Sequence, residues 1–399
     1  MPWKRTDPMS ERIKMISEYL DANYSVAELA RRYEVSRRIF YKWLERYERG
    51  GWEALKDQTR APRRQALAIS EQVEAAILEL KARWPDWGAP KLRHKLAQQL
   101  GRAKCPAEST VSAVLKRHGL IRTRRPKRRP VPGGLSPLEH CREANALWCA
   151  DFKGWWLTGD RRRCEPLTVS DAWSRFLLRC AGMNHGTTGP EVRAHFELLF
   201  REYGLPLAIR TDNGPPFASV GLGGLTALSV WWLRLGLRLE RITPGCPQEN
   251  GRHERIHLSL EQSRARHPRA TLGLQQKALE QFRHEYNHER PHEALGQRVP
   301  AELYRPSPRT YNGRLPAARS YPDGWMARRV TDAGQMKWEG KLVMVTRALA
   351  GEHIGLEPRG DGVWAVWFEN LEMGSFEEPK GRIRPNKHLP ATAQPEVES

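Results

Sequence analysis

Three acidic residues in three separate segments have the spacing and surroundings to act on a phosphodiester. Asp151 lies in the mostly apolar run ALWCADFKGWWL, Asp212 opens the turn DNG 61 positions later, and Glu254 follows after another 42 positions. Three such carboxylates can hold two divalent cations, of which one activates an attacking oxygen and the other stabilises the leaving oxygen. Hard oxygen ligands favour Mg²⁺ or Mn²⁺ over softer metals.

Two strand ends and one helix are expected to position these acids. Between about residues 135 and 308 the pattern predicts strands followed by alternating helices and strands, which is the order of a mixed sheet flanked by helices. Asn250 and Gly251 can start the helix that carries Glu254. The predicted strands are 147–157, 163–170, 175–182, a short one ending at 212, and 237–242; the predicted helices are 189–203, 222–235, 249–266 and 271–288.

Basic residues concentrate in the first third of the chain, where a helix-turn-helix is expected. The formal charge is +20, and residues 1–134 carry 30 Lys and Arg against 15 Asp and Glu. Ser25 and Ser36 are predicted to cap the second and third of three helices, and Gly50-Gly51 to end the third. The third helix is expected to bury Ile39, Phe40, Trp43, Leu44 and Tyr47, and to present to DNA Arg37, Arg38, Tyr41 and Lys42. A trihelical interaction domain is the alternative.

A second helical unit, a basic connector and a β-rich end complete the predicted plan. Residues 69–120 read as three helices, and the connector RTRRPKRRPVPGG is too rich in Pro and Gly for regular structure. It would follow the DNA backbone through Arg122, Arg124, Arg125, Lys127, Arg128 and Arg129. Beyond Pro316, short alternating strands around turns such as Asp361-Gly362 predict a small antiparallel barrel, followed by a disordered tail.

Cysteine spacing and hydropathy exclude several classes of protein. The six cysteines contain no CxxC pair, which fits neither a disulfide scaffold nor a thiolate zinc site, so reduced thiols are expected. The sequence shows neither a signal peptide nor an apolar run long enough to span a membrane. A cytoplasmic protein without a membrane partner is therefore expected.

Three motifs in this order resemble those of the integrase-type DDE transposases of bacterial insertion sequences and, more distantly, of retroviral integrases. They are WxxDFKG, TDNGxxF and PxxPQxNGxxER, accompanied by TVSDAWSRF and by YNHERPHEALGQRVPAELY, so the resemblance spans about residues 140–305. It implies a ribonuclease-H-like core in which Asp151, Asp212 and Glu254 bind the metal and catalyse. Glu249 is the rival for the third position, but the family motif leaves its place variable.

The resemblance also separates supporting residues from the three acids. Asp171 matches an Asp of the fold that is not a metal ligand, so a structural role is expected for it. His284, His288 and His292 have metal-like spacing, but Pro291 would interrupt the helix and the resemblance assigns this run to packing. Two further basic residues beside the glutamate, Arg252 and Arg255, are expected to contact DNA.

The sequence therefore predicts a multidomain transposase that binds terminal inverted repeats, cleaves to free 3′-OH ends and joins them to target DNA. Its core would be α/β, preceded by all-α units, and it would act on DNA at least as a dimer near the nucleoid. A transcriptional regulator, a catalytically retired relative and a metal-dependent nuclease stay open. The predicted domains are a helix-turn-helix at 1–55, a winged-helix-like unit at 65–121, a linker at 122–134, the catalytic core at 135–308, an SH3-like barrel at 317–388 and a tail at 389–399.

Overall fold

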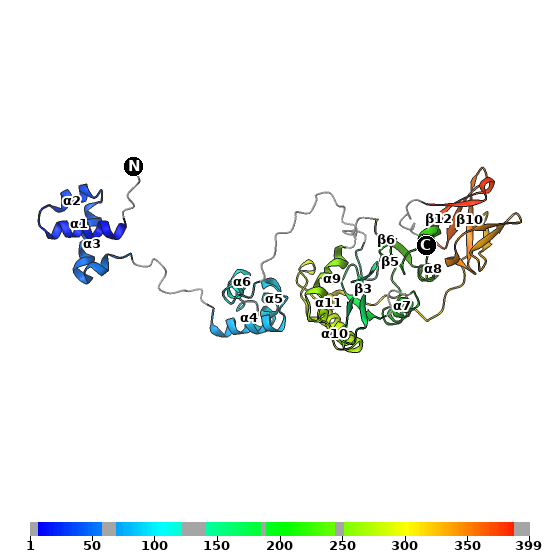
Figure 1. The fold of residues 1–399 in the computed structure, drawn as a ribbon, viewed down its shortest axis with the longest axis horizontal. Helices are drawn as coiled ribbons and strands as arrows, with labels where there is room; N and C mark the ends of the chain where they lie inside the picture. The colour runs from blue at the N-terminus through cyan, green and yellow to red at the C-terminus, as the bar shows by residue number, and fades with distance from the viewer. Residues whose placement is uncertain (1–6, 58–68, 122–140, 185–188, 244–250, 387–399) are drawn as a thin grey trace. The chain divides into compact units, whose positions relative to one another are not determined.

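The computed structural model describes residues 7–57, 69–121, 141–184, 189–243 and 251–386. The chain divides into two compact units, residues 1–70 and residues 71–399. Figure 1 shows the elements of each unit, coloured from blue at the N-terminus to red at the C-terminus. The predicted linker at 122–134 and the predicted tail at 389–399 lie outside the described residues.

The first unit is a three-helix domain whose helix ends follow the predicted caps. The Ser25 side chain forms a capping box with Glu28, and the Ser36 hydroxyl accepts a hydrogen bond from the Ile39 amide. Gly51 follows the third helix with φ +64°, a conformation that favours glycine. The elements are α1 (Pro8–Leu20), α2 (Val26–Arg32), α3 (Arg37–Gly50) and the 3₁₀ turn η1 (Trp52–Leu55), packed around Met15, Ile16, Leu29, Phe40, Leu44 and Leu55.

One residue of the predicted core of α3 is on the surface instead. Ile39 is 43% exposed, whereas Phe40 is fully buried. The row of residues that includes Ile39 and Trp43 runs along the border of the buried face, and Trp43 is covered by the Arg12 guanidinium, 3.8 Å from its ring centroid. The prediction for Ile39 was wrong because a residue at the border of the buried face is buried only where a side chain from another element covers it.

The second unit begins with another three-helix bundle. Its helices are α4 (Glu71–Arg83), α5 (Ala89–Leu100) and α6 (Glu108–Arg117), and its core contains Ile77, Leu80, Leu92, Leu96, Val111, Val114 and Leu115. Pro90 lies in the first turn of α5, and Gly101 follows that helix with φ +82°. Pro90 and Gly101 thus mark the start and the end of α5.

A six-stranded mixed sheet forms the centre of the second unit. Strand β1 pairs antiparallel with β3 and parallel with β5, and β5 pairs parallel with β6. Strands β2 and β4 both pair antiparallel with β3, which is the longest strand of this sheet. The strands are β1 (Trp148–Phe152), β2 (Trp156–Leu157), β3 (Arg163–Asp171), β4 (Leu177–Met183), β5 (Ala208–Thr211) and β6 (Arg238–Arg241).

Helices cover both faces of this sheet because alternate residues of its strands point to opposite sides. Leu167 and Val169 of β3 pack in the cluster that contains α7 (Gly189–Tyr203) and α8 (Ala227–Arg234), whereas Cys164 packs with α9 (Gly251–Gln262) and α10 (Leu272–His284). The remaining helical segments are η2 (Leu222–Gly224), η4 (Arg264–Arg266), a π-helical turn (Glu285–Glu289), η6 (Glu293–Leu295) and α11 (Pro300–Leu303).

The C-terminal region is β-rich as predicted, but the predicted barrel is wrong. Within the described residues it holds an open five-stranded antiparallel sheet in the order β13-β12-β11-β10-β7 and a separate hairpin, β8-β9, and neither sheet closes on itself. The sequence pattern predicts strands and turns but not which edges pair. The elements are β7 (Met326–Arg329), β8 (Gln335–Trp338), β9 (Lys341–Met344), η7 (Arg347–Leu349), β10 (His353–Gly360), β11 (Val363–Phe368), β12 (Leu371–Glu377), η8 (Glu378–Lys380) and β13 (Arg382–Pro385).

The C-terminal sheet and the central sheet share one hydrophobic core. Trp231 and Trp232 of α8 belong to the same buried cluster as Leu349 of η7 and Met373 of β12. Arg234 at the end of α8 forms an ion pair with Glu352 at 2.6 Å. The two sheets are therefore packed around common buried residues.

A core substitution on the C-terminal side is expected to destabilise both sheets. Leu349→Ala should lower the free energy of unfolding by about 2–5 kcal/mol, because a fully buried leucine is removed from the shared core. Leu342→Ala, at a 61% exposed side chain of β9, should change it by less than about 0.5 kcal/mol. Denaturant unfolding of residues 71–399, the compact unit that contains both sheets, should give one coincident transition by circular dichroism and tryptophan fluorescence. An early transition confined to one probe would contradict the shared core.

Candidate active site

The pairing of two parallel strands aligns the first two acids. Trp148 lies opposite Ile209 and Cys149 opposite Arg210, an offset of 61 residues that also separates Asp151 from Asp212. Continued to the strand ends, this register sets the two acids side by side on strands about 4.8 Å apart. Both carboxylates therefore belong to the same edge of the sheet.

Asp151 has a carboxylate environment that favours its protonated form. Burial, then the negative charge of Asp212 and then that of Glu254, raise the pKa of Asp151 to about 7 from its usual 3.8. The amide of Phe152 donates to Asp151 Oδ1 at 2.8 Å and opposes this shift without cancelling it. Asp212 and Glu254 thus both act electrostatically on Asp151, and Asp212 has the larger effect of the two.

The DNG turn presents the second carboxylate. The Gly214 amide donates to Asp212 Oδ1 at 3.2 Å, and the Asn213 side-chain amide donates to the Ile242 carbonyl at 2.7 Å, which anchors the turn to the end of β6. A Cβ at position 214 would lie 3.1 Å from Asp212 Oδ2, so glycine leaves the carboxylate its room. This arrangement is an Asx turn of the kind that the sequence indicates.

The third acid lies in the first turn of α9. The helix begins at Gly251, so Glu254 is exposed near its N-terminus while Ile256 and Leu260 are buried against β3 and α10. Ile256 and Leu260 therefore form the inward-facing side of this helix. The rival Glu249 lies outside the described residues.

Two histidines of α9 enter the site in a way that sequence reasoning missed. His253 and His257 both hydrogen-bond with the Thr168 hydroxyl through Nε2 at 2.8 Å, and His253 Nδ1 also contacts the Ser170 hydroxyl at 2.9 Å. His257 Nδ1 lies 3.9 Å from Asp151 Oδ2. Their i, i+4 spacing was the available signal, since it places two imidazoles on one side of the helix.

An ion pair also ties the two elements at the other end of the helix. Lys153 Nζ lies 3.0 Å from Glu261 Oε2, and Arg266 contacts the same carboxylate at 3.4 Å. Lys153 follows Asp151 by two residues, so the end of β1 is held against the last turn of α9. The helix that carries Glu254 is therefore fixed to the sheet at both of its ends.

Asp171 has the structural role that the sequence analysis expected. Its Oδ1 accepts the Asn145 amide at 2.7 Å, and its Oδ2 accepts the Ser174 amide and hydroxyl at 2.7 and 2.6 Å. Burial raises the pKa of this carboxyl despite these hydrogen bonds. Asp171 thus closes the turn between β3 and β4 rather than facing the other acids.

Of the three histidines with metal-like spacing, His292 is buried as the packing role implies, whereas His284 and His288 are exposed. His284 ends α10 and His288 lies in the π-helical turn, with 4.8 Å between their ring centroids. His292 is buried, and its ring lies 4.7 Å from that of Tyr286. The helix does not continue to His292, as Pro291 led us to expect.

The donor set of the three acids fits a divalent cation in its chemistry. Throughout the described ranges, no three His, Cys, Asp or Glu side chains lie close enough to hold a metal ion as they stand. Burial, and after it the negative charges of Asp212 and Glu254, nevertheless raise the pKa of Asp151. A cation bound there would offset that charge, and oxygen donors suit Mg²⁺ or Mn²⁺.

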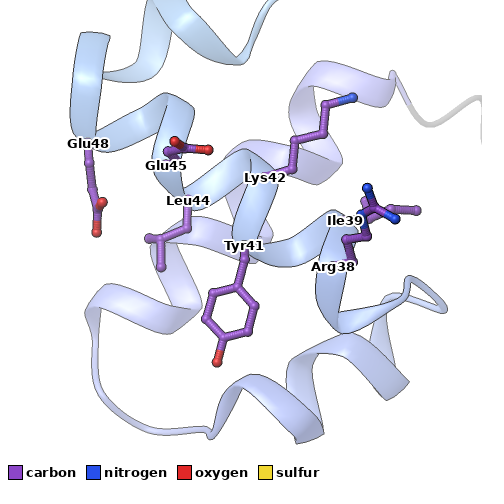
Figure 2. A pocket seen from close by; sticks show the side chains of 7 residues that line it. All are labelled: Arg38, Ile39, Tyr41, Lys42, Leu44, Glu45 and Glu48. Atoms are coloured by element: carbon purple, nitrogen blue, oxygen red, sulfur yellow. The ribbon is translucent and has the colours of Figure 1, made fainter.

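The predicted DNA-contacting residues of α3 are exposed. Arg37, Arg38, Tyr41 and Lys42 all point to solvent, and Tyr41 is 55% exposed. Figure 2 shows the shallow pocket along this helix, with Arg38 and Ile39 near one end and Glu48 near the other. The N-terminal half of α3 thus carries basic residues without acidic ones, and it is the part that enters the major groove in helix-turn-helix proteins.

The other predicted DNA contacts are only partly described. Arg255 is an exposed residue of α9, whereas the side chain of Arg252 lies outside the described part of the chain. The connector residues are likewise outside it, namely Arg122, Arg124, Arg125, Lys127, Arg128 and Arg129. No helix in the described residues is long and apolar enough to cross a membrane.

Comparison with known proteins gives matches in each part of the chain. Residues 11–64 match a helix-turn-helix domain, residues 39–115 a homeodomain-like domain and residues 235–300 an integrase core domain. The chain thus combines helix-turn-helix DNA-binding domains with an integrase core. Residues 325–383 match the C-terminal domain of IS481 family transposases. The predicted resemblance to integrase-type transposases of bacterial insertion sequences is confirmed.

Proteins of insertion elements are among the similar sequences. An uncharacterized 31.7 kDa protein of insertion element IS407 from Burkholderia multivorans is 28% identical over 235 residues, which cover 59% of this chain and 81% of that protein. An uncharacterized 39.2 kDa protein of IS476 from Xanthomonas euvesicatoria is 30% identical over 184 residues, which cover 46% of this chain and 51% of that protein. The chain thus spans about half the length of the second relative.

Retroviral integrases are among the similar solved structures. The catalytic core domain of HTLV-2 integrase, solved in complex with magnesium, has a TM-score of 0.32 and 17% identity and covers 41% of this chain and 99% of its own. The catalytic core domain of BIV integrase has a TM-score of 0.30 and 21% identity. The match covers 40% of this chain and 93% of the BIV chain. The family resemblance rests on the sequence matches given above.

Proposed function

We propose that this protein is an active DNA transposase that cleaves the ends of an insertion sequence and joins them to target DNA. The observation that carries the proposal is the β1-β5 register, which sets Asp151 beside Asp212 at the strand ends, in a chain that also matches a helix-turn-helix domain. A transcriptional regulator has no use for three such acids. Hydrolysis would free a 3′-OH, and that hydroxyl would then attack the target phosphodiester.

The residues have separable tasks in this reaction. Bound Mg²⁺ or Mn²⁺ would supply the charge that activates the attacking oxygen and stabilises the leaving one. Asp151, Asp212 and Glu254 would hold it, with the DNG turn fixing the carboxylate of Asp212 by its hydrogen bond to Gly214. The N-terminus of α9 adds partial positive charge on the side where Glu254 lies, which favours a nearby phosphate.

DNA recognition would be divided among the parts before the core. The helix α3 would read base edges of the terminal inverted repeats, and the basic connector would follow the backbone. Because two ends of an element must be cut and joined together, at least a dimer is expected on DNA. The protein would act on chromosomal DNA in the bacterial cytoplasm.

A joining assay distinguishes this proposal from its two alternatives. The substrate is a duplex that ends in the inverted repeat flanking the gene. The strand that is to be cleaved to a 3′-OH carries the label, and the duplex is incubated with Mg²⁺ and a circular target DNA. We expect nicking at the repeat terminus followed by covalent transfer of the label to the target. Nicked product without transfer would instead identify a nuclease, and binding without either product a catalytically retired relative.

Substitution at the start of α3 is expected to weaken sequence-specific binding selectively. Arg38→Ala should cost about 1–3 kcal/mol on the preferred sequence and much less on random DNA, since a base contact is lost. Arg49→Ala, at the other end of the same helix, is the matched control, because Arg49 already pairs with Glu45. Equal losses of affinity on the preferred sequence and on random DNA would refute the role given to α3.

The salt dependence of DNA binding is a separate test of the basic N-terminal part. The logarithm of the binding constant of residues 1–134 should fall with the logarithm of the salt concentration, with a slope of about −0.9 for each phosphate neutralised.

A further inference from the structure

A single hydroxyl joins the helix of the third acid to the strand of the first. The Thr168 side chain donates to or accepts from three groups: the Asp151 carbonyl at 3.0 Å and Nε2 of both His253 and His257 at 2.8 Å. Thr168 itself lies directly opposite Asp151 in the β1-β3 register and is fully buried. The contact is therefore central to the site and closed to water.

The number of hydrogen bonds that the Thr168 hydroxyl can donate and accept decides which nitrogen of each histidine carries hydrogen. A hydroxyl has one hydrogen to donate and two lone pairs that accept. The Asp151 carbonyl only accepts, so it takes the Thr168 hydrogen, and both imidazoles must donate their Nε2–H to Thr168. His253 Nδ1 is then free to accept from the Ser170 hydroxyl, which lies at 2.9 Å.

The two histidines are one helical turn apart, and Glu254 lies on the turn between them. Because both rings bond the same oxygen, that turn of α9 is held at its beginning and at its end. The same oxygen bonds the backbone of Asp151, so a single atom links the carriers of two of the three acids. Displacing it would change the separation of Asp151 and Glu254.

We propose that Thr168 is a positioning residue that sets the separation of Asp151 and Glu254 through His253 and His257. The role rests on the proposed function, in which these two acids share bound metal. It adds that metal affinity depends on a hydroxyl that touches neither metal nor DNA. Ligand-orienting groups of this kind change metal affinity or activity by about 10- to 100-fold when removed.

Two conservative variants and one control test the proposal. Thr168→Val keeps the shape of the side chain but removes its hydroxyl, whereas Thr168→Ser keeps the hydroxyl and removes the methyl group. Thr158→Val removes another buried threonine hydroxyl, one that bonds Asp160 and the Arg162 carbonyl away from α9. We expect the Mg²⁺ concentration for half-maximal strand cleavage to rise about 10- to 100-fold in Thr168→Val, and to stay within about threefold of the wild-type value in Thr168→Ser and Thr158→Val.

A spectroscopic readout on the full-length, metal-free protein separates this proposal from the proposed function. With ¹⁵N-labelled histidine, the wild-type protein should show two imidazoles in the Nε2–H form whose protons exchange slowly with water. Both signals should be lost in Thr168→Val and kept in Thr168→Ser and Thr158→Val. Retention of both signals in Thr168→Val, or an unchanged Mg²⁺ requirement, would overturn the role of Thr168. Absence of strand joining by the wild-type protein with the signals present would instead contradict only the proposed function.

Discussion

Asp212→Asn is expected to abolish strand cleavage and joining while leaving binding to terminal-repeat DNA nearly intact. The substitution removes a negative charge at the edge of the sheet where the metal would bind, and it keeps the size and the turn-forming ability of the side chain. We expect a loss of at least about 10³-fold in cleavage rate, which corresponds to about 4 kcal/mol in the barrier. Labelled-duplex cleavage and gel-shift binding measure the two properties on the same preparation.

Metal binding provides an independent check of this expectation. Mg²⁺ should raise the unfolding temperature of the wild-type protein, since a ligand that binds only the folded state stabilises it. The rise should be lost in Asp212→Asn. Asp171→Asn is unsuitable as a control because Asp171 is buried in a turn, whereas Asp332→Asn changes an exposed residue of the C-terminal region. Normal joining by Asp212→Asn would show that the acids are misassigned.

Glu254→Gln is expected to lose both 3′-end cleavage and strand transfer, in contrast to Glu249→Gln. A metal ligand must be held within about 0.5 Å of its working position, and a helix holds it better than a loop. Glu254 lies in the first turn of α9, whose next turn is anchored by Ile256 and Leu260. Glu249 precedes the first residue of that helix, so Glu249→Gln should keep cleavage within about tenfold, or about 1.4 kcal/mol.

Glu249→Gln is the control for Glu254→Gln, because each variant removes one carboxylate and the two positions are five residues apart. Each should keep the affinity of the wild-type protein for terminal-repeat DNA, which excludes misfolding as the cause of any loss. An inactive Glu249→Gln protein together with an active Glu254→Gln protein would reverse the assignment. The family resemblance would survive that result, since it rests on other residues as well.

Many of the helix starts and turns could be predicted because their signals are local. Ser25 and Ser36 cap helices by hydrogen bonds to residues three positions away, and the DNG turn at Asp212 forms its own hydrogen bond to Gly214. The order of the sequence motifs resembles that of integrase-type transposases, and this resemblance predicted that the three acids act together. The parallel pairing of β1 and β5 could not be predicted from the pattern alone, since register depends on partners distant in sequence.

The features that the sequence did not reveal are all long-range. The Thr168 hydroxyl meets two histidines 85 and 89 residues away, and Lys153 meets Glu261 across the same interface. The barrel prediction failed for the same reason, because strand count and turn position leave the pairing of the edge strands undetermined. Ile39 shows the complementary case, in which helical periodicity places a residue at the border of a face without showing what covers it.

The shared core between α8 and the C-terminal sheet has a consequence for chimeric proteins. Residues 1–70 form a compact unit of their own, so this DNA-binding part can be exchanged for that of a relative without redesigning the rest. Residues 326–385 are different, because Leu349 and Met373 complete the hydrophobic cluster of Trp231 and Trp232. A transplanted C-terminal sheet would need matching substitutions in α8, so these two segments should be inherited together when insertion elements recombine.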